Sequence, residues 1–247
     1  MEILVAGRLE EPEIGLGLQQ ALHEEVASGE RGPTALTWTS SRYVGATRPE
    51  TRLPGFREAV REAERLGFPV LVRNSGGGAV AANEGSISFS LTFPVQDLRH
   101  GLYERYAEGV DLIASALRRL GVAAEGGEVE GEFCPGVHSV RSGGPHGVKH
   151  AGLAQRVTRR AARVEALILV SKTAELVPVL QCFYGALGLP FRPESIANLP
   201  ADVQGVVEAL IAETSKRYGD EPRKLDEATL RKALATRGEW LVISETG

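Results

Sequence analysis

The chain has 247 residues, of which 43% are hydrophobic and 24% charged, values typical of a globular protein large enough to bury a core. No apolar run approaches the roughly 20 residues of a membrane span, and the N-terminus lacks the basic and apolar segments of a secretory signal, so we expect a cytoplasmic protein without membrane contact. A net charge of −4 gives no general attraction for nucleic acid, and two cysteines cannot build a disulfide framework.

Hydrophobic periodicity and turn residues predict alternating helices and strands in the first half of the chain, and a C-terminal third rich in helices. We expect one catalytic domain over residues 1–247, with 200–247 as a helical C-terminal extension. The predicted helices cover 15–27, 54–65, 101–120, 176–187, 203–211 and 226–236, and the predicted strands 34–39, 68–73, 86–93 and 163–170.

A glycine-rich loop, Asn74–Val80, connects two of the predicted strands. Gly76, Gly77 and Gly78 have no β-carbons, so their backbone amides can approach an anionic or carbonyl oxygen closely. The loop therefore predicts a ligand cradle, and the alternative is a tight turn without a ligand.

Cys134 is the candidate nucleophile. It precedes Pro135-Gly136, and because a residue before proline is disfavoured in the α region, the thiol is expected on a turn outside any helix. Lys149 follows across a glycine-rich segment that can fold the chain back, so the two residues can meet across a hairpin. An ammonium ion in contact with the sulfur would favour the thiolate.

Four acidic residues make such a cation necessary, because nearby negative charge suppresses a thiolate. They are Glu125, Glu128, Glu130 and Glu132. From spacing alone, a buried structural cysteine is as good an interpretation of Cys134 as a nucleophile.

Sequence signals for other kinds of chemistry are weaker than those for a thiol nucleophile. No phosphate-binding loop or dinucleotide fingerprint is present. His138 could act as a base for Cys134, although no orienting carboxylate is evident. A Cys-x3-His and a His-x3-His pattern resemble zinc ligands, although the glycine-rich loop does not fix their geometry. The residues of these patterns are Cys134, His138, His146 and His150.

Two further features have structural interpretations. Cys182 lies in a predicted amphipathic helix and is expected to be a core thiol without chemistry. Arginines at the start of the last predicted strand could bind phosphate or an acidic partner, or could line a solvated strand edge. They are Arg156, Arg159, Arg160 and Arg163.

Three motifs in order, Val72–Val80, Glu130–Gly136 and Lys149–Arg156, resemble the biotin/lipoate protein ligase superfamily, and within it the cysteine-containing octanoyltransferase branch. The resemblance covers about residues 34–188. It implies an α+β fold related to class II synthetase domains, in which mixed β-sheets and flanking helices form an acyl-binding tunnel.

The same resemblance implies roles for individual residues. Cys134 would be the acyl-thioester nucleophile and Lys149 the residue that ionises it. No metal and no cofactor are implied. The residues expected to bind the acyl substrate are Arg73, Ser75, Gly76, Gly77, Gly78, Ala79 and Gly152.

The motifs look most like those of amidotransferases that move octanoyl from the glycine-cleavage H protein (GcvH) to lipoyl-domain acceptor proteins. Close relatives take octanoyl from acyl carrier protein, so either donor is expected. One rival is an ATP-dependent lipoate-protein ligase, which would use Lys149 on an activated acyl phosphate and have no use for Cys134. A rival of another class is a non-catalytic protein that binds lipoyl domains or acyl groups.

Overall fold

The computed structural model describes residues 1–97 and 101–242. The strands of its large sheet are β1 (Glu2–Leu9), β2 (Thr34–Ser40), β6 (Ser86–Pro94), β7 (Glu125–Gly126), β8 (Ser139–Ser142), β9 (Val148–Val157), β10 (Ala161–Leu169) and β11 (Pro222–Lys224). Their order is β11-β1-β2-β6-β10-β9-β8-β7. β1 pairs in parallel with β2 and β11, and the other neighbours are antiparallel, so the sheet is mixed as expected.

A smaller sheet of β3 (Tyr43–Thr47), β4 (Val70–Arg73) and β5 (Val80–Ala82) has the order β4-β3-β5. β3 is parallel to β4 and antiparallel to β5. The α-helices are α1 (Pro12–Ser28), α2 (Phe56–Arg65), α3 (Leu102–Arg119), α4 (Thr173–Ala186), α5 (Val203–Tyr218) and α6 (Glu227–Ala235).

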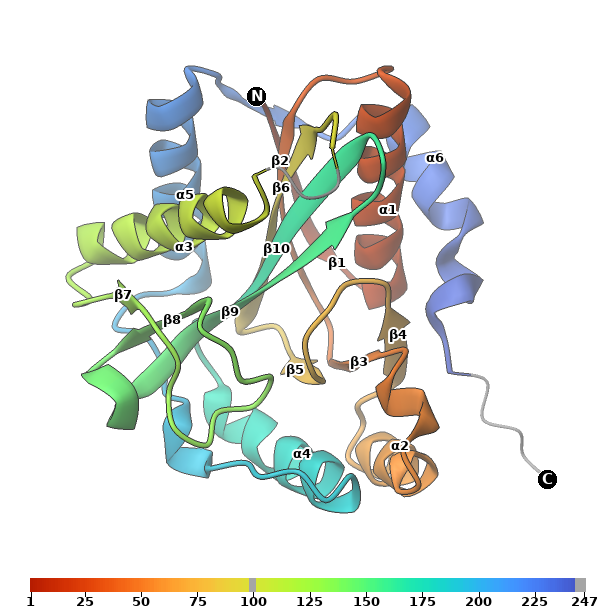
Figure 1. Ribbon diagram of the computed structural model, residues 1–247, viewed down its shortest axis with the longest axis vertical. Coiled ribbons are helices and arrows are strands. Elements are labelled where there is room, and N and C mark those ends of the chain that lie inside the picture. Colours follow the sequence, from red (N-terminus) through yellow and green to blue (C-terminus); the bar gives the residue numbers. More distant parts are fainter. Residues whose placement is uncertain (98–100, 243–247) are drawn as a thin grey trace.

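Helices cover both faces of the large sheet (Figure 1). α3 and α5 pack together on one face, α1 packs on the other, and α6 lies against α1 on its outer side. α2 and α4 pack against each other beside the small sheet, at the lower end of the molecule in Figure 1. The combination of mixed sheets and flanking helices confirms the predicted α+β class.

Strand β6 separates the two faces by simple alternation. Its apolar residues Ile87, Phe89 and Leu91 join the core beneath α3 and α5, whereas Ser88 and Ser90 point to the opposite face. Successive side chains of a strand alternate between faces, so this serine-apolar pattern makes one face a packed core. The other face gains small polar side chains, which leave room above the sheet.

Helix boundaries follow local signals. α1 begins at Pro12, whose missing N–H is not needed in the first turn, and ends at Gly29 with a left-handed φ of 82°. α5 begins after Asp202, whose carboxylate accepts a hydrogen bond from the Gly205 N–H at 2.8 Å. The predicted helices are confirmed, with ends that differ by at most three residues except for α5, which continues seven residues beyond its predicted end to Tyr218.

Several strands were not predicted. Periodicity predicts no strand over residues 2–9. These residues form β1, which pairs with β2 on one side and with β11, from a distant part of the sequence, on the other. β11 also shows that residues 200–247, expected to be a helical extension, contribute a strand to the large sheet. Local patterns do not reveal strands whose stability comes from long-range pairing.

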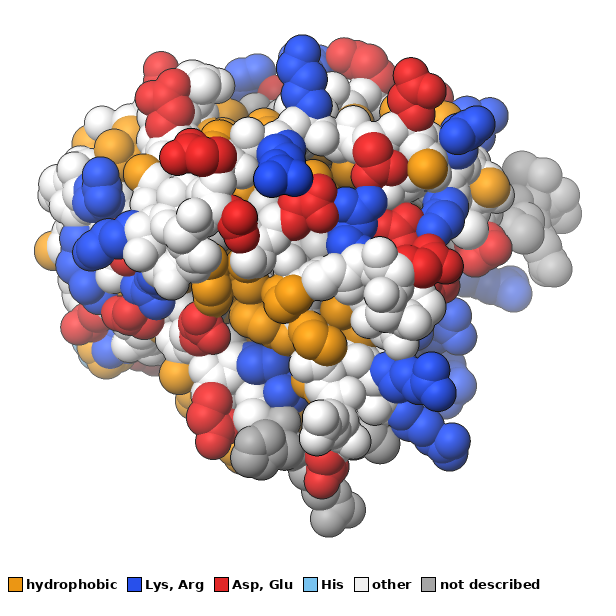
Figure 2. All heavy atoms as spheres, turned by 90° about the horizontal axis from the view of Figure 1, so that it is seen from above, with side chains coloured by type: hydrophobic (Ala, Val, Ile, Leu, Met, Phe, Trp, Pro, Cys, Tyr) orange, Lys and Arg blue, Asp and Glu red, His pale blue; other side chains and the backbone are white. Residues whose placement is uncertain are grey.

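Within residues 1–97 and 101–242, no helix combines the length and the hydropathy needed to span a bilayer. Figure 2 shows one face of the molecule, on which basic and acidic side chains are interspersed around an apolar area.

Candidate active site

A narrow cavity of about 40 Å³ lies on the α1 side of the large sheet. Strand register explains its floor: Trp38, Ser88, Leu167 and Gly152 occupy successive paired positions across β2, β6, β10 and β9. Its lining residues are Leu16, Gln19, Trp38, Tyr43, Arg73, Val80, Ser88, Cys134, Gly152, Leu153, Ala154, Glu165, Ala166 and Leu167. The site therefore combines an apolar channel, a thiol and a few buried polar groups.

Cys134 lies in the loop between β7 and β8, outside any helix as predicted, and it is 9% exposed. Its φ of +44° is in the left-handed region, which costs a non-glycine residue about 1–3 kcal/mol. Hydrogen bonds on both sides hold this conformation. The Cys134 N–H donates to Tyr184 Oη at 2.6 Å, and the Cys134 carbonyl accepts from Lys149 Nζ at 3.0 Å.

The Cys134 sulfur faces the glycine loop. The Gly78 N–H donates to Sγ at 3.1 Å, and Arg73 Nη2 lies 3.9 Å from it. Gly77 has a φ of +93°, and a β-carbon there would lie 2.8 Å from the sulfur. The loop therefore approaches the thiol closely only because residue 77 is glycine, and the structure brings together the first two predicted motifs.

Lys149 lies on β9, completely buried beneath the Cys134 loop. Its ammonium donates to Glu132 Oε1 at 3.0 Å, to Phe133 O at 2.8 Å and to Cys134 O at 3.0 Å. An ammonium group has three N–H donors, and all three point to oxygens among the described residues. Lys149 thus meets Cys134 across the β8–β9 hairpin, at its carbonyl oxygen. Its expected action on the sulfur stays a prediction.

Gly152 on β9 makes room for this arrangement. A β-carbon at Gly152 would lie 2.9 Å from Lys149 Cε and 3.0 Å from Nζ. The residue lines the cavity and also leaves space for the buried lysine.

Glu132, the acidic partner of Lys149, is completely buried. Besides the ammonium, its carboxylate accepts hydrogen bonds from Val129 N, Gly136 N and Ser139 Oγ. We call Lys149 and Glu132 the lysine pair. It ties the loop on both sides of Cys134 to β8 and β9.

The other acidic residues near Cys134 in sequence are differently placed. Glu125 pairs with Arg141, and Glu130 pairs with the exposed His146. Glu128 has a side chain on the exposed surface. Of the four expected acidic neighbours, Glu132 is the one in the interior, and it has its own cation.

A second buried ion cluster lies on the other side of the sulfur. Arg73 Nη1 donates to Ser75 Oγ at 2.6 Å and lies 3.5 Å from Glu165 Oε1, and Ser75 Oγ donates to the same carboxylate oxygen. Glu165 Oε2 accepts from Arg163 Nε at 2.8 Å and lies 2.7 Å from Arg163 Nη2. We call Arg73, Glu165 and Arg163 the arginine cluster.

The charge state of Glu165 follows from this setting. Burial by itself raises the pKa of the carboxyl group, but Arg163, Arg73 and the Ser75 hydroxyl together hold that pKa below its ordinary value. Glu165 is therefore an anion at neutral pH.

Two residues that the sequence analysis missed fix the glycine loop. Glu50 accepts from the Ala79 N–H at 2.7 Å through one oxygen and from Thr47 through the other. Tyr184 Oη donates to Ala79 O at 2.8 Å while it accepts from Cys134 N. Burial raises the pKa of Tyr184, which keeps its donor proton. Neither residue has a local sequence signal, because each acts across a long sequence separation.

The predicted substrate-binding residues do not all line the cavity. Arg73 and Gly152 do, whereas Gly76 is exposed with open space around it. Ser75 binds the arginine cluster, and the Ala79 backbone is used by Glu50 and Tyr184.

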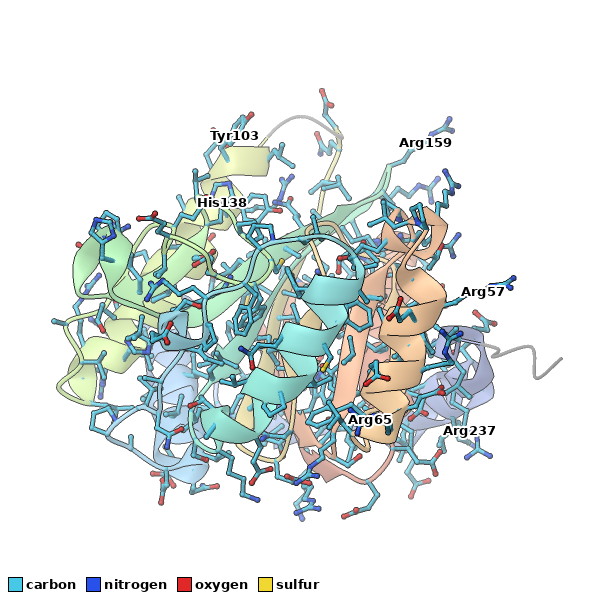
Figure 3. The ribbon with its side chains drawn as sticks, turned by 90° about the horizontal axis from the view of Figure 1, so that it is seen from below. Arg57, Arg65, Tyr103, His138, Arg159 and Arg237 are labelled. Atoms are coloured by element: carbon cyan, nitrogen blue, oxygen red, sulfur yellow. The ribbon has the colours of Figure 1, made fainter. Side chains whose placement is uncertain are left out.

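The alternative interpretations of the histidines do not assemble a site. Within the described ranges, no group of three or more His, Cys, Asp and Glu side chains is placed to hold a metal ion. His138 stacks on the ring of Tyr106 with centroids 3.9 Å apart, and it lies on the same side of the molecule as Tyr103 in Figure 3. His150 is hydrogen-bonded to Ser142, and His146 is at the surface.

Two structural expectations were wrong. β10 lies between β6 and β9, so Arg163 is not on a solvated strand edge, and it is buried in the arginine cluster. Arg159, in contrast, points outward in Figure 3. Cys182 is half-buried on α4 and does not belong to the core.

Residues 11–213 match the lipoyl protein ligase A/B catalytic domain. The chain belongs to this family. An octanoyl-[GcvH]:protein N-octanoyltransferase of Bacillus velezensis is 30% identical over 220 residues, which are 82% of this chain and 76% of that protein. The corresponding protein of Geobacillus kaustophilus is 30% identical over 179 residues, 72% of this chain and 62% of that one.

A solved structure of lipoate-protein ligase A bound with ATP has a TM-score of 0.76 and 19% identity, and the match covers 97% of this chain and 95% of the ligase. At this identity the likeness shows a common fold. It confirms the ligase-type architecture that the three motifs imply.

Proposed function

We propose that this family member transfers octanoyl groups to lipoyl-domain lysines in lipoate assembly, through an octanoyl thioester on Cys134. An acyltransferase of this kind needs a nucleophile at the end of an acyl channel. The observation that carries the proposal is the position of the Cys134 sulfur, which lines the cavity and accepts the Gly78 N–H. The names of the relatives supply the octanoyl group and GcvH as its carrier.

The reaction balances without a nucleotide. The Cys134 sulfur attacks the octanoyl carbonyl on the donor, a carbon–sulfur bond forms, and the bond to the donor's lysine nitrogen breaks, with the thiol proton passing to the departing amine. The amine of the acceptor lysine then attacks the thioester, forms the new amide and returns a proton to the thiol. One amide is exchanged for another, so the overall step is near isoenergetic.

Binding of the octanoyl chain in the cavity would assist both the formation and the discharge of the thioester. Apolar side chains such as Leu16, Trp38 and Leu167 line the cavity, and burial of an octanoyl chain would contribute about 0.8 kcal/mol per methylene. In the proposal the lysine pair holds the Cys134 loop in place during attack.

The first test is intact-mass analysis after incubation with octanoylated GcvH. We expect wild-type protein and a Cys182→Ser control to gain one octanoyl group, and Cys134→Ser to gain none. A wild-type protein that gains no octanoyl group under these conditions would contradict the thioester proposal and would fit a non-catalytic binding protein.

The second test separates the transferase from the ATP-dependent ligase. The Cys134→Ser variant is given ATP, free octanoate and an acceptor lipoyl domain. We expect no lipoyl-domain octanoylation, because the proposed transfer needs the Cys134 thiol and only a ligase route would bypass it. A Cys134→Ser variant that modifies the acceptor at the wild-type rate with ATP would establish the ligase instead.

The donor is tested by a direct competition. Octanoyl-GcvH and octanoyl-acyl carrier protein are supplied in equal amount, and transfer to the acceptor is followed by mass. We expect GcvH to be the preferred donor. Preferential discharge of acyl carrier protein would leave the chemistry at Cys134 intact and change the donor.

A further inference from the structure

Two buried cations lie near Cys134, and they differ in where their donors point. Lys149 directs its N–H groups to oxygens of Glu132 and the loop backbone. Arg73 directs Nη2 both to the Gly78 carbonyl at 2.7 Å and toward the Cys134 sulfur at 3.9 Å. Among the described residues, Arg73 is the cation with a donor on the sulfur.

The orientation of Arg73 depends on residues behind it. Ser75 and Glu165 engage Nη1, which leaves Nη2 on the side of the thiol. Glu165 is itself fixed by Arg163, whose Nη1 and Nη2 bind Gln19 O and Asn74 Oδ1, both at 2.9 Å. A planar guanidinium is held rigidly when its fork is occupied in this way.

The charges within the arginine cluster also favour a thiolate at Cys134. Two guanidinium groups, on Arg73 and Arg163, face one carboxylate, on Glu165, and all three residues are less than 10% exposed. A thiolate on Cys134 would lie beside the Arg73 guanidinium of this cluster. Glu50, another buried carboxyl group near the glycine loop, is directed to the Ala79 and Thr47 N–H groups.

We propose that Arg73 is the catalytic cation of the Cys134 thiolate, and that Glu165 on β10 is a positioning residue that holds Arg73 against the sulfur. The proposal rests on Cys134 being the nucleophile of the proposed function. It assigns Arg73 a role beyond substrate binding and gives a role to a buried glutamate that sequence reasoning did not select.

The test measures thiol reactivity apart from acyl transfer. In a Cys182→Ser background, alkylation of Cys134 by iodoacetamide is followed by mass across a pH range. We expect Arg73→Met to move the alkylation profile to higher pH by about one unit or more, the effect of losing an opposite charge close by. Glu165→Gln should move it in the same direction but by less, because Arg73 is no longer held against the sulfur while the loss of a nearby carboxylate by itself favours the thiolate. Arg73→Lys keeps the charge without the fork and should fall between wild type and Arg73→Met.

A matched control uses another buried carboxylate. Glu213 on α5 is 4% exposed and pairs with Arg217, on the far side of the sheet from the cavity. Glu213→Gln should leave the alkylation profile unchanged. If Glu165→Gln does not fold, Ser75→Ala carries the test, because it removes the hydroxyl that links Arg73 to Glu165 and keeps both charges.

The variants should also be non-additive. Arg73→Met combined with Glu165→Gln should shift the profile no more than Arg73→Met alone, because Glu165 acts through Arg73. A folded Ser75→Ala protein with the wild-type alkylation profile would overturn the positioning role, and a wild-type profile in Arg73→Met would overturn the whole proposal.

Failure of the Arg73 and Glu165 roles can be distinguished experimentally from failure of the proposed octanoyl transfer. If wild type forms no octanoyl-enzyme but the Arg73 and Glu165 variants shift alkylation as expected, the inference holds and the acyl chemistry fails. If wild type forms the octanoyl-enzyme and alkylation is insensitive to both variants, the proposed function holds and this inference fails.

Discussion

The lysine pair and the arginine cluster are both buried and both next to Cys134, yet they are built differently. In the lysine pair, one cation meets one carboxylate and two backbone carbonyls, so charge and hydrogen bonding are complete within the fold. In the arginine cluster, two guanidinium groups share one carboxylate, and Arg73 Nε has no partner among the described residues. A closed ion pair stabilises a backbone, whereas an incomplete one is available to a reacting group.

The largest effect is expected from a substitution that breaks the lysine pair. Lys149→Met leaves the Glu132 charge buried and unpaired, so we expect a loss of about 3–5 kcal/mol in unfolding free energy, measured by urea denaturation. The iodoacetamide profile should remain close to that of wild type when both charges are removed, in the folded Glu132→Gln/Lys149→Met protein, because no buried charge of the pair is then left unpaired.

Glu132→Gln combined with Lys149→Met serves as the control, because it removes both charges and should cost less than the sum of the single changes. A Lys149→Met protein of wild-type stability but strongly retarded alkylation would reverse the roles assigned to the two clusters.

The next effect concerns Tyr184, which joins the Cys134 loop to the glycine loop. Tyr184→Phe removes the acceptor of the Cys134 N–H and the donor to Ala79 O, so two buried backbone groups lose their partner. We expect a loss of about 1–3 kcal/mol in thermal or urea unfolding. The rate of octanoyl-enzyme formation should fall as well, because the strained Cys134 backbone is released. Unchanged stability and rate would show that the lysine pair holds Cys134 without Tyr184.

A smaller effect tests the approach of the glycine loop to the sulfur. Gly77→Ala places a methyl group 2.8 Å from the Cys134 sulfur and adds a cost of about 1–2 kcal/mol for a left-handed backbone. Gly67→Ala has the same backbone cost, with a φ of +81°, but open space around it. We expect Gly77→Ala to lose more stability than Gly67→Ala because of this added contact, and only Gly77→Ala to slow alkylation of Cys134. Equal alkylation rates in the two variants would show that the close approach of Gly77 to the Cys134 sulfur does not affect the reactivity of the thiol.

The smallest effect comes from a buried group with no counter-charge. His150, adjacent to Lys149 on β9, is 3% exposed, and burial lowers its pKa to about 4. The unfolded chain takes up the proton near pH 6.5 and the folded protein only near pH 4, so stability is complete above pH 6.5 and declines between these values.

At pH 5.5 we expect His150 to account for a loss of about 1 kcal/mol relative to pH 7, measured by urea denaturation at both values. His150→Gln should reduce the difference between the two pH values. An unchanged pH dependence in this variant would assign the acid sensitivity to other groups.

The sequence by itself determined much of the scaffold. Amphipathic spacing predicted the α-helices, because each helix buries one face and repeats it every three to four residues. Cys134 could be assigned to a turn from Pro135 alone, and the glycine run identified the loop that contacts its sulfur. The three motifs were sufficient to indicate the family and hence the fold.

Only the tertiary structure decided which cation belongs to which partner. Lys149 and Arg73 are both plausible partners for a thiol in a linear sequence, and β9 register and the closing of the Cys134 loop direct the lysine to Glu132 and carbonyls. Glu165 appears in sequence as one polar residue within an apolar strand. Its place beside Arg73 arises because β10 and the small sheet, far apart along the chain, face each other across the cavity. Side-chain partners are set by long-range packing, which local periodicity does not encode.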